Sequence, residues 1–82
     1  MTQYEYVQEL SNYLLRKYDT TVTLSKDEHW MAGYHLSFSG RFNKDTYFKA
    51  EEERWKDVLI AMTNNVIEGR NPREGIEDYI QH

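Results

Sequence analysis

Cysteine is absent from the 82-residue chain, proline occurs once and glycine only four times. The lack of cysteine excludes disulfides, thiolate metal sites and cysteine nucleophiles. No run of about 18 apolar residues is present, so the sequence predicts no transmembrane helix. Residues 1–5 lack the basic and apolar stretches of a signal peptide, and we therefore expect a cytoplasmic protein.

Basic residues are outnumbered, since 14 Asp and Glu stand against ten Lys and Arg and give a formal net charge of −4. This balance argues against binding to nucleic acid or to an anionic membrane by bulk electrostatics. Aromatic residues make up 15% of the chain. That content is too high for a disordered chain, and the length suits a single domain over residues 1–82.

The first half of the chain predicts a helix followed by a hairpin. Helical spacing of apolar residues covers residues 4–18, preceded by a capping-box pattern of Thr2 and Glu5. Residues 20–25 are β-branched and alternate, which predicts a strand. Apolar side chains then occupy the even positions between 30 and 42, so we expect a second strand. A short third strand near Arg41 is left open.

A second helical pattern covers residues 43–68. Spacings of four and three alternate along it through Phe48, Glu52, Trp55, Leu59, Met62 and Val66. Gly69 is a natural C-terminal stop, and Pro72 suits the first position of a short last helix that would carry Ile76, Tyr79 and Ile80.

The length of this second helix does not match the expected sheet. A helix over residues 43–68 would extend roughly 35–40 Å, against about 20 Å for a six-residue strand. We therefore expect either a break near residues 63–65 or packing of the helix end on a second chain. The short connection after Gly69 favours a monomer over a homodimer through the long helix.

The predicted fold is α+β, with a two- or three-stranded antiparallel sheet covered on one face by helices in the order α-β-β-(β)-α-α. Its predicted core consists of Val7, Leu10, Leu14, Val22, Leu24, Leu36, Phe38, Trp55, Val58, Leu59 and Met62.

No catalytic or metal constellation is recognisable. His29, His35 and His82 follow no metal-ligand spacing. Ser37 and Ser39 share a strand face with His35, but an ordinary polar sheet face explains this pattern. We therefore expect a non-catalytic protein without metal or cofactor.

The segment Lys49-Ala50-Glu51-Glu52-Glu53-Arg54 bears on nucleic-acid binding. The order α-β-β-(β)-α resembles the double-stranded-RNA-binding domain, a family that docks the Lys-rich start of its last helix on phosphates. Here the corresponding charges are mostly of the opposite sign. A nucleic-acid-binding module therefore stays the alternative function, together with a housekeeping interaction domain.

Acidic residues gather in two stretches of the second half. We consider both as candidate partner-binding sites: Glu51, Glu52, Glu53 and Asp57 in the first, and Glu74, Glu77 and Asp78 in the second. Solubility is the simpler explanation of such charges. Tyr and Trp are common interface anchors, and their abundance favours binding to protein.

The segment Tyr18-Asp19-Thr20-Thr21-Val22-Thr23-Leu24-Ser25 predicts a strand directly after the first helix. With its small size and acidity, the chain resembles phage-encoded anti-CRISPR inhibitors of Cas9. The resemblance implies a non-catalytic inhibitor or regulator, from a phage or other mobile element, of a nucleic-acid-handling protein. It assigns no individual binding residues.

Overall fold

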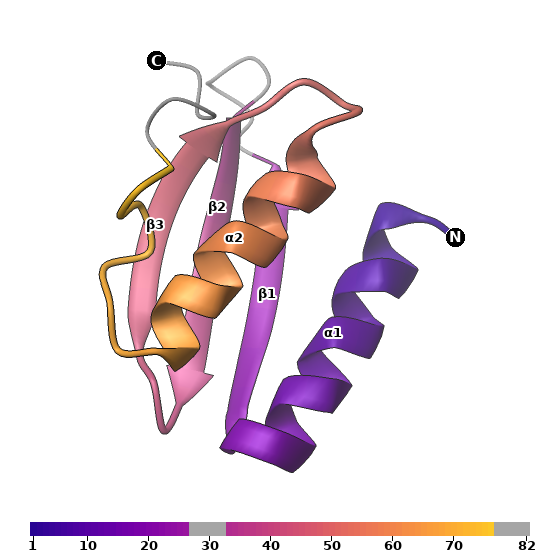
Figure 1. The fold of residues 1–82 in the computed structure, drawn as a ribbon. Helices are drawn as coiled ribbons and strands as arrows, with labels where there is room; N and C mark the ends of the chain where they lie inside the picture. The colour runs from indigo at the N-terminus through magenta and orange to yellow at the C-terminus, as the bar shows by residue number, and fades with distance from the viewer. Residues whose placement is uncertain (27–32, 77–82) are drawn as a thin grey trace.

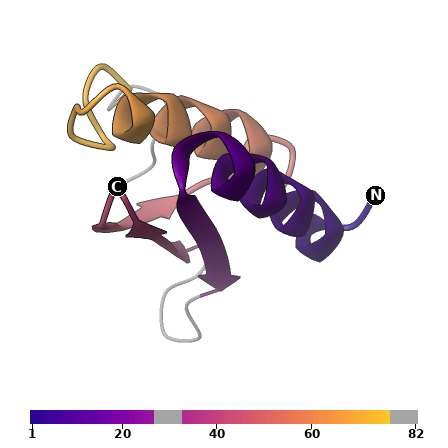
Figure 2. The same cartoon turned by 90° about the horizontal axis from the view of Figure 1, so that it is seen from below.

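The computed structural model describes residues 1–26 and 33–76. It contains α1 (Gln3–Tyr18), β1 (Thr20–Lys26), β2 (Gly33–Gly40), β3 (Lys44–Lys49) and α2 (Trp55–Ile67). The strands form an antiparallel sheet in the order β1-β2-β3. Both helices cover the same face of this sheet, as the two views show (Figures 1 and 2). The predicted α+β class is confirmed, with three strands.

Local signals at both ends determine the extent of α1. The Thr2 hydroxyl accepts from the Glu5 N–H at 3.1 Å, and the Glu5 carboxylate accepts from the Thr2 N–H at 3.0 Å. This confirms the capping box. At the other end, Asp19 adopts a left-handed conformation with φ 55° and turns the chain into β1.

Alternation along the strands divides the sheet into a core face and an open face. Val22 pairs with Phe38, and Leu36 with Thr46, so that even-numbered side chains lie against the helices. Odd-numbered side chains such as His35 and Tyr47 lie on the other face. Among the described residues, no helix covers that second face (Figure 2).

The predicted helix over residues 43–68 is wrong in its first half, because residues 44–49 form β3. Asn43 closes the turn before it: its Nδ2 donates to the Gly40 carbonyl at 2.8 Å, and its Oδ1 accepts from the Gly40 N–H at 3.3 Å. Phe48 belongs to β3 and is fully buried. Its ring stacks on the Tyr34 ring, with the two centroids 5.2 Å apart.

The short α2 removes the length mismatch. Its 13 residues span about 20 Å, which matches the strands. The expected break at residues 63–65 is absent, because α2 continues to Ile67, and the Thr63 hydroxyl donates to the Leu59 carbonyl at 2.7 Å within it. Met62 and Val66 are buried within the chain, so the argument for a homodimer through a long helix is lost.

Gly69 ends α2, as predicted, by a Schellman arrangement. Its φ is 79°, its N–H donates to the Val66 carbonyl, and the Arg70 N–H donates to the Asn65 carbonyl. The described residues that follow, 71–76, form turns where we predicted the start of a last helix. The Asn71 side chain accepts the Arg73 N–H at 2.9 Å and favours a turn, and Gly75 has φ 75°. Tyr79 and Ile80 lie outside the described residues.

The predicted core is confirmed, with additions. Eight of the eleven predicted residues are buried, and Leu10, Leu24 and Trp55 pack against them while partly exposed. Among the described residues, five further apolar side chains are buried that the prediction left out: Tyr34, Phe48, Ala50, Val66 and Ile76. No helix of the described part is long and apolar enough to cross a membrane.

Candidate protein-binding site

The first acidic stretch lies at the N-terminal end of α2. Glu51, Glu52 and Glu53 stand in the connection between β3 and α2, not on a long helix as expected, and Asp57 lies in the first turn of α2. All four residues are exposed. The Glu51 carbonyl accepts from the Arg54 and Trp55 N–H groups at 2.8 and 3.1 Å, which folds this connection into the start of the helix.

The second acidic stretch is described only in part. Glu74 is exposed in the turns after α2, and Glu77 and Asp78 lie outside the described residues. The Glu74 carbonyl is bonded to Asn65, near the C-terminal end of α2. The Glu74 backbone therefore lies beside Asn65, whereas the first stretch lies at the N-terminal end of α2 (Figure 1).

A hollow brings two of the candidate carboxylates together. Its volume is about 400 Å³. Glu53 and Asp57 line it together with Arg54, and its apolar lining comes from Val58, Ala61 and Ile76. Val58 and Ile76 are buried, whereas Glu53, Arg54 and Asp57 are exposed. The three exposed charged residues therefore form the rim of this feature, and the three apolar residues form its floor. We call this feature the acid-rimmed hollow.

Helical spacing explains one wall of the acid-rimmed hollow. Arg54, Asp57, Val58 and Ala61 are three or four positions apart and so lie on one side of α2. Carboxylates at a helix N-terminus also stabilise the helix through its macrodipole, which gives Asp57 a structural role besides any binding role. The Arg54 N-cap position has no side-chain cap to supply this stabilisation.

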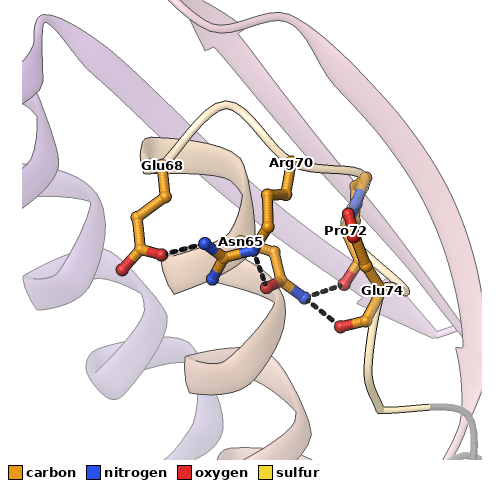
Figure 3. Close-up of polar contacts among 5 residues, drawn as sticks. All are labelled: Asn65, Glu68, Arg70, Pro72 and Glu74. Carbon is orange, nitrogen blue, oxygen red and sulfur yellow. Dashed lines mark hydrogen bonds and ion pairs between the residues drawn. The ribbon is translucent and has the colours of Figure 1, made fainter.

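The other wall depends on Asn65, which is buried on α2 (Figure 3). Its Nδ2 donates to the carbonyls of Pro72 and Glu74 at 2.9 and 2.8 Å, and its Oδ1 accepts from the Arg70 Nε at 3.1 Å. The Arg70 guanidinium also pairs with Glu68. These contacts, which we call the Asn65 clasp, hold residues 70–76 against α2 and thereby set the position of Ile76.

The same segment reaches the outer edge of β3. Arg73 Nη1 donates to the Tyr47 carbonyl, and Figure 1 shows the segment running beside β3. At the opposite edge of the sheet, the buried Ser11 hydroxyl accepts the Val22 N–H at 3.0 Å. Backbone groups on both edge strands are thus capped by side chains, which limits pairing with other chains at these points.

An aromatic cluster joins the N-terminal halves of the two helices. Tyr6 of α1 meets Trp55 edge-on with ring centroids 5.7 Å apart, and Lys56 Nζ lies 4.7 Å from the Tyr6 ring centroid. Burial raises the pKa of the Tyr6 phenol, and the negative charge of Asp57 raises it further. Lys56 is therefore engaged with aromatic rings at the same end of α2 as the rim carboxylates.

The open sheet face carries an ordered polar group. His35 Nε2 lies 2.8 Å from Asp45 Oδ1, and the His35 ring stacks on Tyr47 with centroids 4.6 Å apart. Within residues 1–26 and 33–76, no three His, Asp or Glu side chains are grouped to hold a metal ion. His29 and His82 lie outside those residues.

Sequence reasoning missed the placement of Ile76 in the acid-rimmed hollow and the Asn65 clasp. The spacing from Arg54 to Ala61 could have indicated one wall, but nothing in the sequence places Ile76 opposite α2. An Asn within the apolar stripe of a helix was the only signal for the clasp. No protein-family model, no curated protein and no solved structure matches this chain.

Proposed function

We propose that this protein is a small non-catalytic protein-binding domain whose acid-rimmed hollow contacts its partner. The observation that carries the proposal is the position of Glu53 and Asp57 on the rim of an apolar hollow. Neither carboxylate has an ion-pair partner among the described residues. Exposed carboxylates beside apolar area suit a partner that presents basic side chains.

We further propose that the partner is a nucleic-acid-handling protein and that binding inhibits or regulates it. Such proteins present Lys and Arg to phosphates. Carboxylates placed against those cations compete with nucleic acid for the same surface. The resemblance to phage-encoded anti-CRISPR inhibitors supports the same class of partner and an origin in a phage or other mobile element.

Local clustering, rather than net charge, supports this proposal. The whole chain carries 14 acidic residues against ten Lys and Arg, which is a modest net charge of −4. Ten cations dilute the acidic charge, so net charge alone is a weak reason to expect binding. The run Glu51 to Glu53 and Asp57 makes one end of α2 locally acidic.

The α-β-β-β-α order favours one alternative, a nucleic-acid-binding module of double-stranded-RNA-binding layout. In that layout the start of the last helix faces phosphate, and here that position carries carboxylates. A gel shift at low salt separates the two functions. We expect no shift with duplex DNA or RNA, whereas a micromolar, salt-sensitive shift would favour the alternative.

Capture from nuclease-treated bacterial lysate, read by quantitative mass spectrometry, tests the proposal itself. The first bait is the unaltered chain, and the second carries Glu52→Lys, Glu53→Lys and Asp57→Lys. The third bait carries Glu74→Lys, Glu77→Lys and Asp78→Lys, which changes the net charge equally. We expect a protein retained by the first and third baits and lost from the second. Equal capture by all three folded baits would contradict the proposal.

A further inference from the structure

We infer that the acid-rimmed hollow accepts a single Lys or Arg side chain of the protein partner. This inference rests on the proposed function and adds the chemistry of the contact. The hollow, about 400 Å³, lies at the small end of the range of ligand sites, which is about 300–1,000 Å³. It has room for one long side chain and does not need a folded surface to fill it.

The layering of the hollow matches the two parts of a basic side chain. Lys and Arg bury an aliphatic stem while keeping the charged group near water. Val58, Ala61 and Ile76 offer an apolar floor to such a stem, and Glu53 and Asp57 offer oxygens at the rim to its cation. A neutral apolar side chain would leave the rim carboxylates unused, and an acidic one would be repelled by them.

Nearby cations of the chain do not cancel this rim. Lys56 is held over the rings of Tyr6 and Trp55, at 4.7 and 5.9 Å from their centroids. Arg54 shares the rim and contributes one positive charge, and the N-terminus of α2 adds about half a charge. Lys56 keeps its charge over the rings, so the positive charges sum to about 2.5, and the three exposed carboxylates of Glu52, Glu53 and Asp57 exceed them by about half a charge.

The direct test is a titration of the ¹⁵N-labelled chain with N-acetyl-arginine methylamide, followed by amide chemical shifts. The matched probe is the citrulline analogue, which has nearly the same shape but no charge. We expect the arginine probe to shift amides of residues 53–61 and 76 with a Kd on the order of 1 mM, and the citrulline probe to bind at least about fivefold more weakly. The lysine analogue should shift the same amides.

Two variants locate the interaction. Glu53→Gln with Asp57→Asn should weaken binding of the arginine probe roughly fivefold to tenfold, while Glu9→Gln with Asp19→Asn, an equal loss of charge elsewhere, should leave it unchanged. Ala61→Met fills the floor without changing charge and should also weaken binding. Amide spectra of each variant alone confirm that it is folded.

Equal binding of the arginine and citrulline probes, or shifts that map away from residues 53–61 and 76, would overturn this inference. So would insensitivity to the Glu53 and Asp57 changes. The proposed function would survive those results if the triple reversal at residues 52, 53 and 57 still abolished partner capture. The two ideas can therefore fail separately.

Discussion

At the scale of single residues, the Asn65 side chain connects α2 to the segment that follows it. All the hydrogen-bonding atoms of its side-chain amide are used, and its three partners lie between residues 70 and 74. It is buried, so its partners cannot turn to water without a local opening of the structure. The position of Ile76, and with it one wall of the acid-rimmed hollow, depends on this side chain.

Asn65→Ala should therefore destabilise the protein by about 1–3 kcal/mol, because it leaves the Pro72 and Glu74 carbonyls without their donor. The matched control is Asn64→Ala, at the exposed neighbouring position, which should change stability by less than about 0.5 kcal/mol. Urea unfolding measures both. Faster amide exchange confined to residues 70–76 would locate the effect, and equal stability of the two variants would show that the Asn65 clasp is unimportant.

Tyr6 supplies a prediction about pH. Burial raises the pKa of its phenol above the ordinary value of 10.0, and Asp57 adds to the shift. The folded state therefore holds the proton more tightly than the unfolded state, so this contribution to stability is complete below pH 10 and is lost as pH rises through the folded-state pKa. Tyr6→Phe should lose less stability above about pH 10 than the unaltered chain does, as measured by urea unfolding across that range. Parallel pH profiles would contradict the shift.

At the scale of elements, two glycines mark where the chain changes direction. Gly40 has φ 132°, and a Cβ there would lie 2.3 Å from the Asp19 carbonyl oxygen. This close approach is fixed by the hydrogen bond from the Arg41 N–H to that same oxygen, at 2.9 Å. Gly69 has φ 79° at the end of α2, but no atom lies within 4 Å of a Cβ placed on it.

The two positions should respond differently to alanine. Gly69→Ala should cost about 1–2 kcal/mol, the strain of a left-handed residue with a side chain. Gly40→Ala should cost clearly more, because the added Cβ also displaces the backbone between α1 and β1. Thermal unfolding of the two variants measures the difference. A smaller loss for Gly40→Ala than for Gly69→Ala would contradict the packing at the start of β1.

Elements with local signals could be predicted from sequence, and those without could not. The Thr2 and Glu5 pattern predicts the start of α1, and the alternation of β-branched residues predicts β1. In contrast, Phe48 falls seven positions before Trp55, a helical spacing that arises by coincidence across a strand and a connection. Only the pairing of β3 with β2 distinguishes a strand over these residues from a helix, and strand pairing is a non-local interaction.

The candidate site divides in the same way. Glu53 and Asp57 could be chosen from composition and spacing, and the structure brings them to one hollow. Ile76 could not be placed there, because its contact with α2 follows from the Gly69 turn and the Asn65 clasp. Side-chain hydrogen bonds across a turn leave no periodic trace in a sequence.

At the scale of the whole molecule, the two helices and the sheet form two layers, and the charged residues of the proposed binding site lie at the N-terminal end of α2. The aromatic contact of Tyr6 with Trp55 joins α1 and α2 beside the acidic connection. Most acidic residues outside the strands are exposed, so charge changes there should leave the fold intact. The oligomeric state stays a prediction: we expect a monomer, and light scattering at two concentrations measures it.

The central claim is that the acid-rimmed hollow binds a protein surface that would otherwise hold nucleic acid. The most direct measurement is competition on the complex captured from lysate: the purified partner is bound to the immobilised chain and challenged with increasing duplex DNA and RNA. We predict that nucleic acid releases the partner, and that the chain carrying Glu52→Lys, Glu53→Lys and Asp57→Lys does not bind it at all. A complex that persists in saturating nucleic acid, together with unchanged affinity of the reversed chain, would contradict the claim.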